Sequence, residues 1–330
     1  MKYYDVNDDL GRGMTFNIVI GGRGIGKTFS ALRRAVGLSG KFIYLRRSKT
    51  EIDLCALPET NPFKAINNHD GTDYRIQRAG DLSSIINADA DVRGYALALS
   101  TFGNLRGVDF SDVDMIFFDE FVPQKNARPI KAEDEAFFNL YETVNRNREL
   151  EGRPPVRVLM LSNAVSINSP ILAALGLVGI LERMIAKDKE YYIDRERSVL
   201  IHLPYDAGFA AEKSMTALYK LTAGSRYSDH AIGNKFAYDS WYNVRSRPLG
   251  EYSPVCSYDD LYIYTHKSRR EYYVCRSAAD CPHYNSQDTQ LNFRKNHGIR
   301  FRDAAISGHM IFCDFAAKAK MYEVLKLETY

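Results

Sequence analysis

The amino-acid sequence predicts an α/β protein whose first domain is a mostly parallel sheet covered by helices. Short apolar runs alternate with helical patterns along the first half of the chain, and a glycine-rich segment joins the first run to a helix. Apolar strands that alternate with helices are typical of parallel sheets buried on both faces. The length of 330 residues exceeds one ordinary core and indicates two domains with a small module between them.

The strands expected in the first domain are short runs rich in apolar and β-branched residues, at 16–20, 41–46, 95–100, 114–118 and 156–161. A first helix is expected over 28–36. A second is expected over 132–148, where apolar side chains recur three and four residues apart, at Phe137, Leu140, Tyr141 and Val144. These elements place the sheet in a first domain of residues 1–195.

The sequence changes character after residue 195. Residues 196–250 are expected to form a linker subdomain with one helix within 206–235, and 251–330 a C-terminal domain. Strands are expected at 252–258, 260–266, 271–276 and 310–313, an exposed polar loop over 277–296, and a final helix over 315–327.

Composition limits the possible partners. The net charge is only +3, so contact with a polyanion should involve a local patch rather than the whole surface. We expect no membrane span, because the chain has no run of about 18 apolar residues, and no secretory signal. The five cysteines form no C-x-x-C pair and are expected to be reduced thiols in a cytoplasm.

A phosphate-binding loop follows the first strand. Its residues satisfy G-x-x-x-x-G-K-[ST] in full and predict ATP binding by Gly21, Gly22, Arg23, Gly24, Ile25, Gly26, Lys27 and Thr28. The glycines let backbone N–H groups turn inward around the phosphates. Lys27 is expected to reach the β- and γ-phosphates and Thr28 to bind Mg²⁺, while the following helix directs its positive end at the anion.

Two carboxylates end the run at 114–118, where Asp119 and Glu120 follow four apolar residues. Burying a charge at a strand end is costly unless the charge has a partner or a task. Asp119 is expected to hold Mg²⁺, and Glu120 to act as the general base that activates water. A surface pair of acids at a strand end is the alternative interpretation.

The Glu beside the Asp favours the ATPase branch, called ASCE, that contains helicases, ring-forming motors and transporters. Proteins of this branch insert an extra strand between the phosphate loop and the acidic strand, and 41–46 and 95–100 are the candidates. At the tip of the next strand, Asn163 is the preferred sensor of the γ-phosphate, with Ser162 second. A turn-capping asparagine is the alternative.

Several basic residues flank these motifs. Arg146 and Arg148 end the second helix, where they either offset its negative end or supply an arginine finger to a neighbouring subunit. The candidates for contact with DNA or with a subunit boundary are Arg46, Lys49, Lys125, Arg128 and Lys131. For Arg46 and Lys49, and for the neighbouring Arg47, a solvated basic edge is an equally simple explanation.

Taken together, the motifs resemble the DNA-packaging ATPases of phi29-like tailed phages, which are related to terminases. The matching stretches lie within 14–170 and include the phosphate loop with its Arg23, Phe-Ile-Tyr-Leu-Arg-Arg-Ser-Lys, Phe-Phe-Asp-Glu-Phe, Thr-Val-Asn-Arg-Asn-Arg-Glu and Leu-Ser-Asn-Ala-Val-Ser. The arginine in the loop and the Asn-Arg-Asn-Arg-Glu run are more specific than the general motifs.

The resemblance implies a homomeric ring, expected to have five subunits, that docks on the portal of an empty capsid in the host cytoplasm. The ring would use ATP and Mg²⁺ to drive double-stranded DNA inward, with Arg146 as the trans-acting finger and Lys49 at the boundary or on DNA. A structural packaging RNA is a further possible partner.

The resemblance also implies a C-terminal domain that is a reduced RNase H-like fold without nuclease activity. Its available carboxylates are Asp259, Asp260, Glu271 and Asp314, at no recognisable spacing. Two alternative functions stay open at this point. One is a terminase-like enzyme with an active nuclease, which needs three or four converging carboxylates. The other is a nucleotide-gated DNA-binding or scaffold protein.

Overall fold

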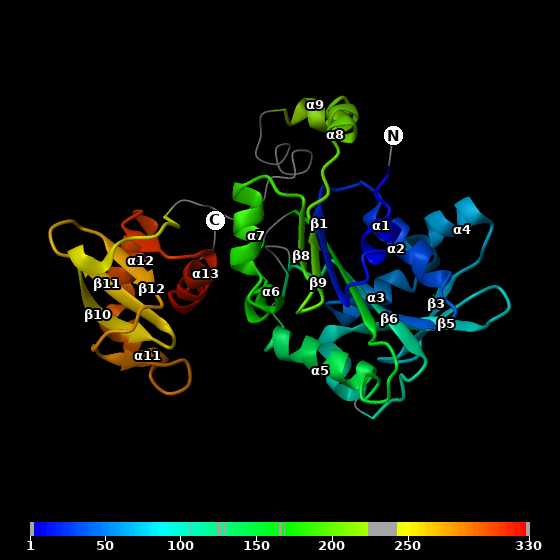
Figure 1. Cartoon of the computed structure of the whole chain (residues 1–330), viewed down its shortest axis with the longest axis horizontal. Coiled ribbons are helices and arrows are strands. Elements are labelled where there is room, and N and C mark those ends of the chain that lie inside the picture. Colours follow the sequence, from blue (N-terminus) through cyan, green and yellow to red (C-terminus); the bar gives the residue numbers. More distant parts are fainter. Residues whose placement is uncertain are drawn as a thin grey trace. The chain divides into compact units, whose positions relative to one another are not determined.

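The computed structural model describes residues 3–105, 107–123, 127–128, 130–164, 167, 169–223 and 243–327 (Figure 1). The chain forms two compact units. The first contains most of the described residues up to 223, and the second contains those from 243 onward together with 167 and 175–182. In the described residues no helix combines the length and the hydrophobicity needed to cross a bilayer.

The first unit contains a nine-stranded sheet whose five central pairings are parallel, as the sequence predicts. Both edges end in antiparallel strands. The spatial order is β3 (Arg75–Gln77), β4 (Ser83–Ile86), β5 (Val92–Ala98), β2 (Lys41–Arg46), β6 (Val113–Asp119), β7 (Arg157–Asn163), β1 (Phe16–Gly21), β9 (Val199–His202) and β8 (Tyr191–Asp194).

The strand inserted between the phosphate-loop strand β1 and the acidic strand β6 is β7. The expectation that 41–46 or 95–100 would fill this place was wrong. Both runs are strands, β2 and β5, but they lie on the far side of β6. The sheet also continues through β9, beyond residue 195, where we expected the first domain to end.

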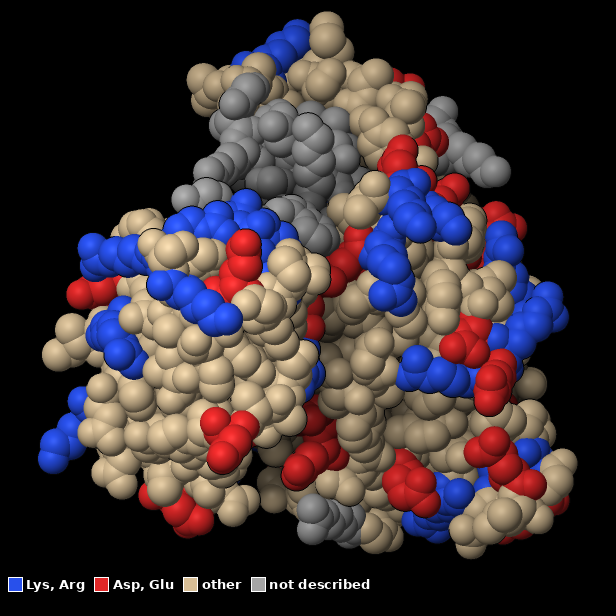
Figure 2. All heavy atoms as spheres, turned by 60° about the vertical axis from the view of Figure 1, so that its left-hand side comes forward, with Lys and Arg blue, Asp and Glu red and all other residues tan. Residues whose placement is uncertain are grey.

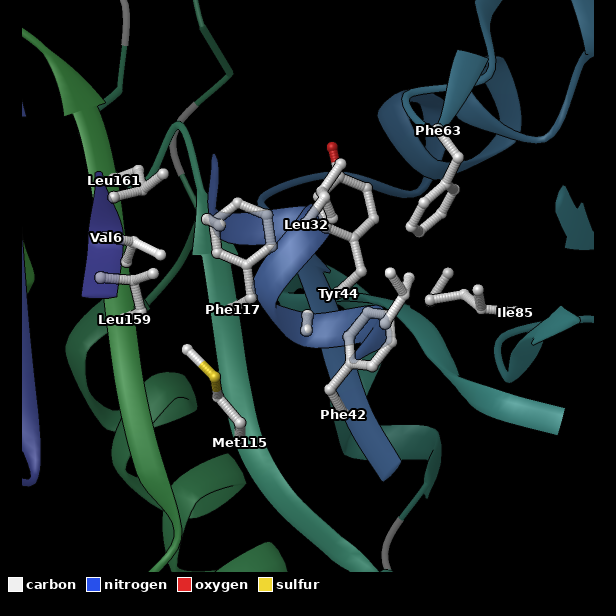
Figure 3. Close-up of a cluster of buried hydrophobic side chains, with 14 of the residues drawn as sticks. Val6, Leu32, Phe42, Tyr44, Phe63, Ile85, Met115, Phe117, Leu159 and Leu161 are labelled. Carbon is white, nitrogen blue, oxygen red and sulfur yellow. The ribbon is translucent and has the colours of Figure 1, made fainter. Parts of the chain in front are cut away.

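Helices cover both faces of this sheet. On one face α1 (Val6–Leu10), α2 (Lys27–Val36), α3 (Lys49–Cys55) and α4 (Lys64–Asp70) share a buried apolar core with the central strands (Figure 3). On the other face α5 (Glu133–Asn145) packs Phe137 against Phe118, with ring centroids 5.9 Å apart. The short helices of this unit are α6 (Pro170–Ala174), α8 (Ala207–Ser214) and α9 (Ala217–Leu221), while α7 (Val178–Ala186) begins in the second unit and ends in the first.

The second unit contains a five-stranded sheet in the order β13 (His283–Tyr284), β10 (Tyr252–Tyr258), β11 (Leu261–His266), β12 (Tyr272–Cys275) and β14 (Met310–Phe312). The three consecutive strands β10 to β12 are antiparallel, and β14 lies parallel beside β12. The RNase H-like assignment stays a prediction.

Helices α11 (Gln290–Phe293), α12 (Ile299–Ile306) and α13 (Phe315–Val324) pack on the core of the second unit, and a π-helical segment, Arg294–Gly298, joins the first two. The stretch 277–296, which we predicted to be an exposed loop, therefore contains β13 and α11. Phe293 on α11 is fully buried. Its contribution to the core explains why this polar stretch folds.

Surface charges of both signs are interspersed. Figure 2 shows lysine and arginine beside aspartate and glutamate over the visible face. This distribution agrees with the small net charge of +3 and restricts any binding of a polyanion to local sites.

Candidate active site

The phosphate loop connects the end of β1 to the first residue of α2, Lys27. Gly24 and Gly26 have φ angles of +84° and +91°, in the left-handed region that glycine tolerates best. A Cβ on Gly26 would also lie 3.2 Å from the Tyr3 ring. The loop is therefore shaped by its glycines, and the positive end of α2 faces into it.

Lys27 curls back over this loop. Its Nζ donates to the carbonyl oxygens of Gly21 at 2.9 Å and of Gly22 at 2.7 Å, and the residue is only 7% exposed. Burial lowers the pKa of Lys27 to about 8, against the opposing pull of Asp119 and Glu120. An anion placed in the loop would restore the charged form of this lysine.

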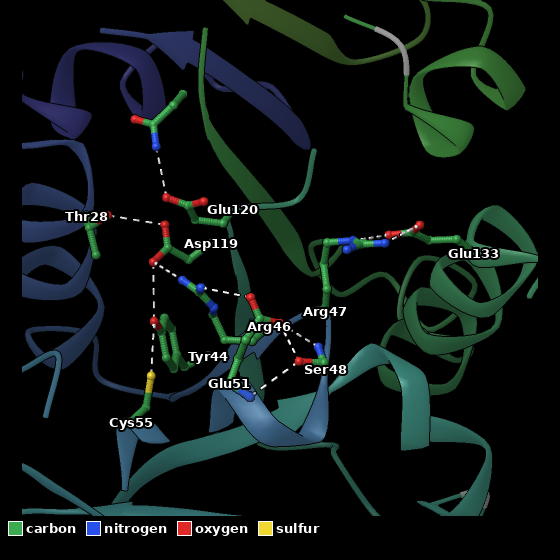
Figure 4. Close-up of polar contacts among 11 residues, drawn as sticks. Thr28, Tyr44, Arg46, Arg47, Ser48, Glu51, Cys55, Asp119, Glu120 and Glu133 are labelled. Atoms are coloured by element: carbon green, nitrogen blue, oxygen red, sulfur yellow. Dashed lines mark hydrogen bonds and ion pairs between the residues drawn. The ribbon is translucent and has the colours of Figure 1, made fainter. Parts of the chain in front are cut away.

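Thr28 and Asp119 meet across the sheet edge, because β1 and β6 end on either side of β7. The Thr28 hydroxyl donates to Asp119 Oδ1 at 3.2 Å (Figure 4). Burial raises the pKa of Asp119, whereas the Arg46 guanidinium acts to lower it. A hydroxyl and a buried carboxylate offer the hard oxygen donors that Mg²⁺ prefers, so the pair fits that ion.

Glu120 and Asn163 lie beside this pair at the ends of β6 and β7. Asn163 Nδ2 donates to Glu120 Oε1 at 2.9 Å, and Asn163 Oδ1 lies 3.4 Å from Lys27 Nζ. The Ser162 hydroxyl instead donates to the adjacent Asn163 carbonyl at 3.2 Å. One pocket contains Gly24, Gly26, Lys27, Thr28, Phe29, Asp119, Glu120, Leu161, Ser162 and Asn163. The residues predicted from three separate motifs thus share one cavity.

The residues predicted to contact DNA or a neighbouring subunit differ in their exposure and in their ion pairs. Arg46 lies beside the cavity, where it forms an ion pair with Asp119 at 3.0 Å and its side chain is only 17% exposed. Lys49 pairs with Asp53 at 2.7 Å on α3. Arg128 and Lys131 are exposed, and Lys125 lies outside the described residues.

One lysine and one arginine near the site make contacts that the sequence did not predict. Lys213 on α8 donates from Nζ to the carbonyl oxygen of Arg23, so α8 covers part of the phosphate loop, while the Arg23 side chain is exposed. Arg47 forms a buried bidentate ion pair with Glu133 of α5, at 2.6 and 2.9 Å. Sequence motifs carry no signal for the Lys213 contact, which joins residues 190 positions apart.

Arg146 and Arg148 lie at the opposite edge of the sheet from the phosphate loop, because α5 starts after the end of β6 and leads to the start of β7. Arg148 is buried and pairs with Asp114 at 3.2 Å. Arg146 is half exposed, donates to the Val108 carbonyl at 2.8 Å and has a φ of +46°. Of the two, only Arg146 presents its guanidinium to the surroundings.

The candidate carboxylates of the second unit are neutralised by basic side chains. Lys320 Nζ lies 3.1 Å from Asp259 and 2.7 Å from Asp260, and Arg276 bridges Asp260 and Asp314. Glu271 lies apart from them, paired with Arg247 at 3.5 Å. Within the described ranges, no three His, Cys, Asp or Glu side chains are placed to share a metal ion.

Comparison with known proteins identifies the family of this chain. The family model of the podovirus DNA encapsidation protein (Gp16) matches residues 1–260. The DNA packaging proteins of Bacillus phages PZA and phi29 are each 30% identical over 250 residues, or 74% of this chain and 69% of theirs. In structure, a chain of the bacteriophage Phi-29 viral genome packaging motor assembly matches 99% of both chains, with a TM-score of 0.70 and 23% identity. The chain therefore belongs to the podovirus DNA encapsidation protein (Gp16) family.

Proposed function

We propose that this chain is the ATP-hydrolysing subunit of a motor that moves double-stranded viral DNA into a preformed capsid. The observation that carries the proposal is the shared cavity of Lys27, Thr28, Asp119, Glu120 and Asn163. The fold and the DNA packaging proteins among its relatives support the same conclusion. The function agrees with the one that the sequence motifs imply.

In this proposal the loop amides and Lys27 hold the ATP phosphates, and Thr28 and Asp119 hold Mg²⁺. The bound ion would offset the charge that develops on the phosphates. Glu120 accepts a proton from the attacking water. Asn163, through its 2.9 Å hydrogen bond, fixes the orientation of the Glu120 carboxylate.

Replacement of Glu120 by Gln tests this mechanism. We expect ATP hydrolysis to fall by at least about a hundredfold while ATP still binds, because general-base catalysis contributes factors of this size. Glu196→Gln, at an exposed position between β8 and β9, is the matched control. Unchanged hydrolysis in Glu120→Gln would show that the mechanism is wrong.

We further propose that the subunits form a homomeric ring, of five subunits by the family resemblance, at the portal vertex of a procapsid in the host cytoplasm. The position of Arg146 supports a ring, since its guanidinium lies at the sheet edge opposite its own phosphate loop. A structural packaging RNA is the remaining proposed partner. Measuring the mass of the assembled ring on procapsids tests the subunit number.

We propose that the C-terminal domain, residues 251–330, has no nuclease activity. Lys320 and Arg276 hold Asp259, Asp260 and Asp314 in ion pairs, which supports a structural role for these acids. Plasmid DNA incubated with the protein and Mn²⁺ or Mg²⁺ should stay intact. Cleavage that is lost in Asp259→Asn would instead favour a terminase-like enzyme with an active nuclease.

A further inference from the structure

Arg46, the last residue of β2, connects two carboxylates that belong to different elements. Its Nη1 donates to Asp119 Oδ2 at 3.0 Å, and its Nη2 lies 3.0 Å from Glu51 Oε1 on α3 (Figure 4). The side chain is 17% exposed, against 7% for Asp119 and 32% for Glu51. A single guanidinium therefore joins the proposed magnesium ligand to a helix outside the nucleotide cavity.

The other oxygen of Glu51 fixes the start of that helix. Glu51 Oε2 accepts hydrogen bonds from the Ser48 N–H at 2.7 Å and the Ser48 hydroxyl at 2.8 Å. Ser48 Oγ in return accepts the Glu51 N–H, which completes a capping box. Movement of Glu51 would therefore move the first turn of α3 with it.

A second contact links Asp119 to the last residue of the same helix. The Tyr44 hydroxyl donates to Asp119 Oδ2 at 3.2 Å and lies 4.0 Å from the Sγ of Cys55. Tyr44 and Arg46 are both on β2, and their side chains converge on the same carboxylate oxygen. A single side chain therefore connects Asp119 to each end of α3, Arg46 at its start and Tyr44 at its end.

The ion pair with Asp119 is open to exchange. A divalent cation held by Asp119 would repel the Arg46 guanidinium, because like charges a few ångströms apart in a partly buried site interact strongly. Glu51, which already pairs with Nη2 at 3.0 Å, would retain the displaced guanidinium. Arg46 Nε is buried and makes no hydrogen bond to the described part of the chain, so the present position leaves one donor unsatisfied.

We propose that Arg46 is a positioning residue that exchanges its shared contact with Asp119 and Glu51 for a contact with Glu51 alone as Mg²⁺ binds, and that it thereby transmits the state of the nucleotide site to helix α3. The inference rests on the proposed function, because it assumes that Mg²⁺ and ATP occupy this site. Helix α3 carries Lys49, so the exchange would reach a candidate contact with a neighbouring subunit or DNA.

A double-mutant cycle separates exchange from a merely structural role. In Glu51→Gln the guanidinium loses its second carboxylate and stays on Asp119, so Mg²⁺ must compete harder. We expect the half-saturating Mg²⁺ concentration for binding of a fluorescent ATP analogue to rise by about three- to tenfold. Gln retains the capping box, so α3 should still form.

Adding Arg46→Met to Glu51→Gln removes the competing cation. The half-saturating Mg²⁺ concentration of the double variant should return to within about twofold of the original value. Glu59→Gln, at an exposed position, is the matched control and should leave this concentration unchanged. If Glu51→Gln has no effect, or if the double variant stays as impaired as Glu51→Gln, the exchange model is overturned.

Hydrogen exchange of the α3 amides gives a second readout that does not depend on hydrolysis. In the original protein, Mg²⁺ with a non-hydrolysable ATP analogue should change the exchange rates of residues 49–55, and the change should be lost in Glu51→Gln. Analogue binding without any change over α3 would overturn this inference alone. Absence of analogue binding in the original protein would overturn the proposed function as well.

Discussion

The ammonium group of Lys27 belongs to an almost fully buried side chain. Burial lowers its pKa to about 8, so near that pH about half of the molecules carry the proton. Bound phosphates favour the charged form and raise this pKa again. We therefore expect ATP binding at pH 8 to take up about half a proton per site, measured by titration calorimetry in buffers with different ionisation enthalpies.

The same measurement at pH 7 is the control, because Lys27 is then mostly protonated before the nucleotide binds. Proton uptake should fall toward zero there. An observed enthalpy that does not depend on the buffer at pH 8 would contradict the assigned environment of Lys27.

Asn163 is the side chain that connects Lys27 to Glu120. Replacement by Ala removes the donor that orients the Glu120 carboxylate, so we expect kcat to fall by about ten- to a hundredfold. The affinity for ATP should change less, since the loop amides remain. Steady-state hydrolysis and equilibrium binding measure the two effects separately.

Ser162→Ala is the natural comparison for Asn163→Ala. The Ser162 hydroxyl bonds to the adjacent backbone carbonyl and to no catalytic group in the described structure, so its loss should leave kcat within about twofold. A larger loss in Ser162→Ala than in Asn163→Ala would reverse the assignment of the sensor.

Helix α5 is tied to the end of β2 by the Arg47–Glu133 pair. Both side chains are almost fully buried, at 7% and 2% exposure. Glu133→Gln would leave the Arg47 charge buried without its counter-ion, so we expect the unit to lose about 3 kcal/mol of unfolding free energy. Urea unfolding followed by far-UV circular dichroism measures the loss in the transition of the first unit.

An apolar pair at these positions should be tolerated far better. The double variant Arg47→Met with Glu133→Leu removes both charges together, and we expect it to recover most of the stability lost in Glu133→Gln. A double variant less stable than Glu133→Gln would mean that the pair contributes net stability beyond mutual neutralisation.

The strands that could be predicted from the sequence are those that are buried on both faces of the sheet. The strands β1, β2, β6 and β7 read as continuous apolar runs because helices cover the sheet on both sides. In contrast, β3 exposes two of its three residues and carries almost no apolar pattern. The order of strands was missed for another reason. Placing β7 between β1 and β6 depends on pairing distant segments, which local patterns do not record.

The residues of the candidate site also divide into those that the sequence predicts and those that it does not. Lys27, Thr28, Asp119, Glu120 and Asn163 could be brought together from the sequence, because loops at the ends of parallel strands share one edge. The contacts of Arg46 with Asp119 and of Lys213 with the loop could not. Both depend on side-chain directions that tertiary packing sets.

In the proposed ring, the sheet separates Arg146 from the phosphate loop of its own subunit. If Arg146 is the proposed finger, it would therefore complete the site of another subunit. Subunits with Arg146→Ala and subunits with Glu120→Gln should each be inactive, yet mixing them pairs an intact Glu120 with a neighbour's intact Arg146. An equal mixture should recover about a quarter of the hydrolysis if sites act independently.

The matched control mixes Glu120→Gln with Lys27→Ala. Both residues lie in the same cavity, so no combination of these subunits contains a complete site and activity should stay at the level of the variants. Lack of recovery in the Arg146 and Glu120 mixture as well would show that Arg146 does not act in trans.

The positive φ angles at two proposed functional residues affect which substitutions a laboratory selection would favour. Glu120 and Arg146 have φ angles of +55° and +46°, where side chains other than glycine are disfavoured by about 1 kcal/mol. Laboratory selection for thermal stability alone would therefore favour glycine at both positions. The selected protein would be more stable but would lack the two proposed functional side chains. Only selection for capsids filled with DNA would retain Glu120 and Arg146 in these disfavoured backbone conformations.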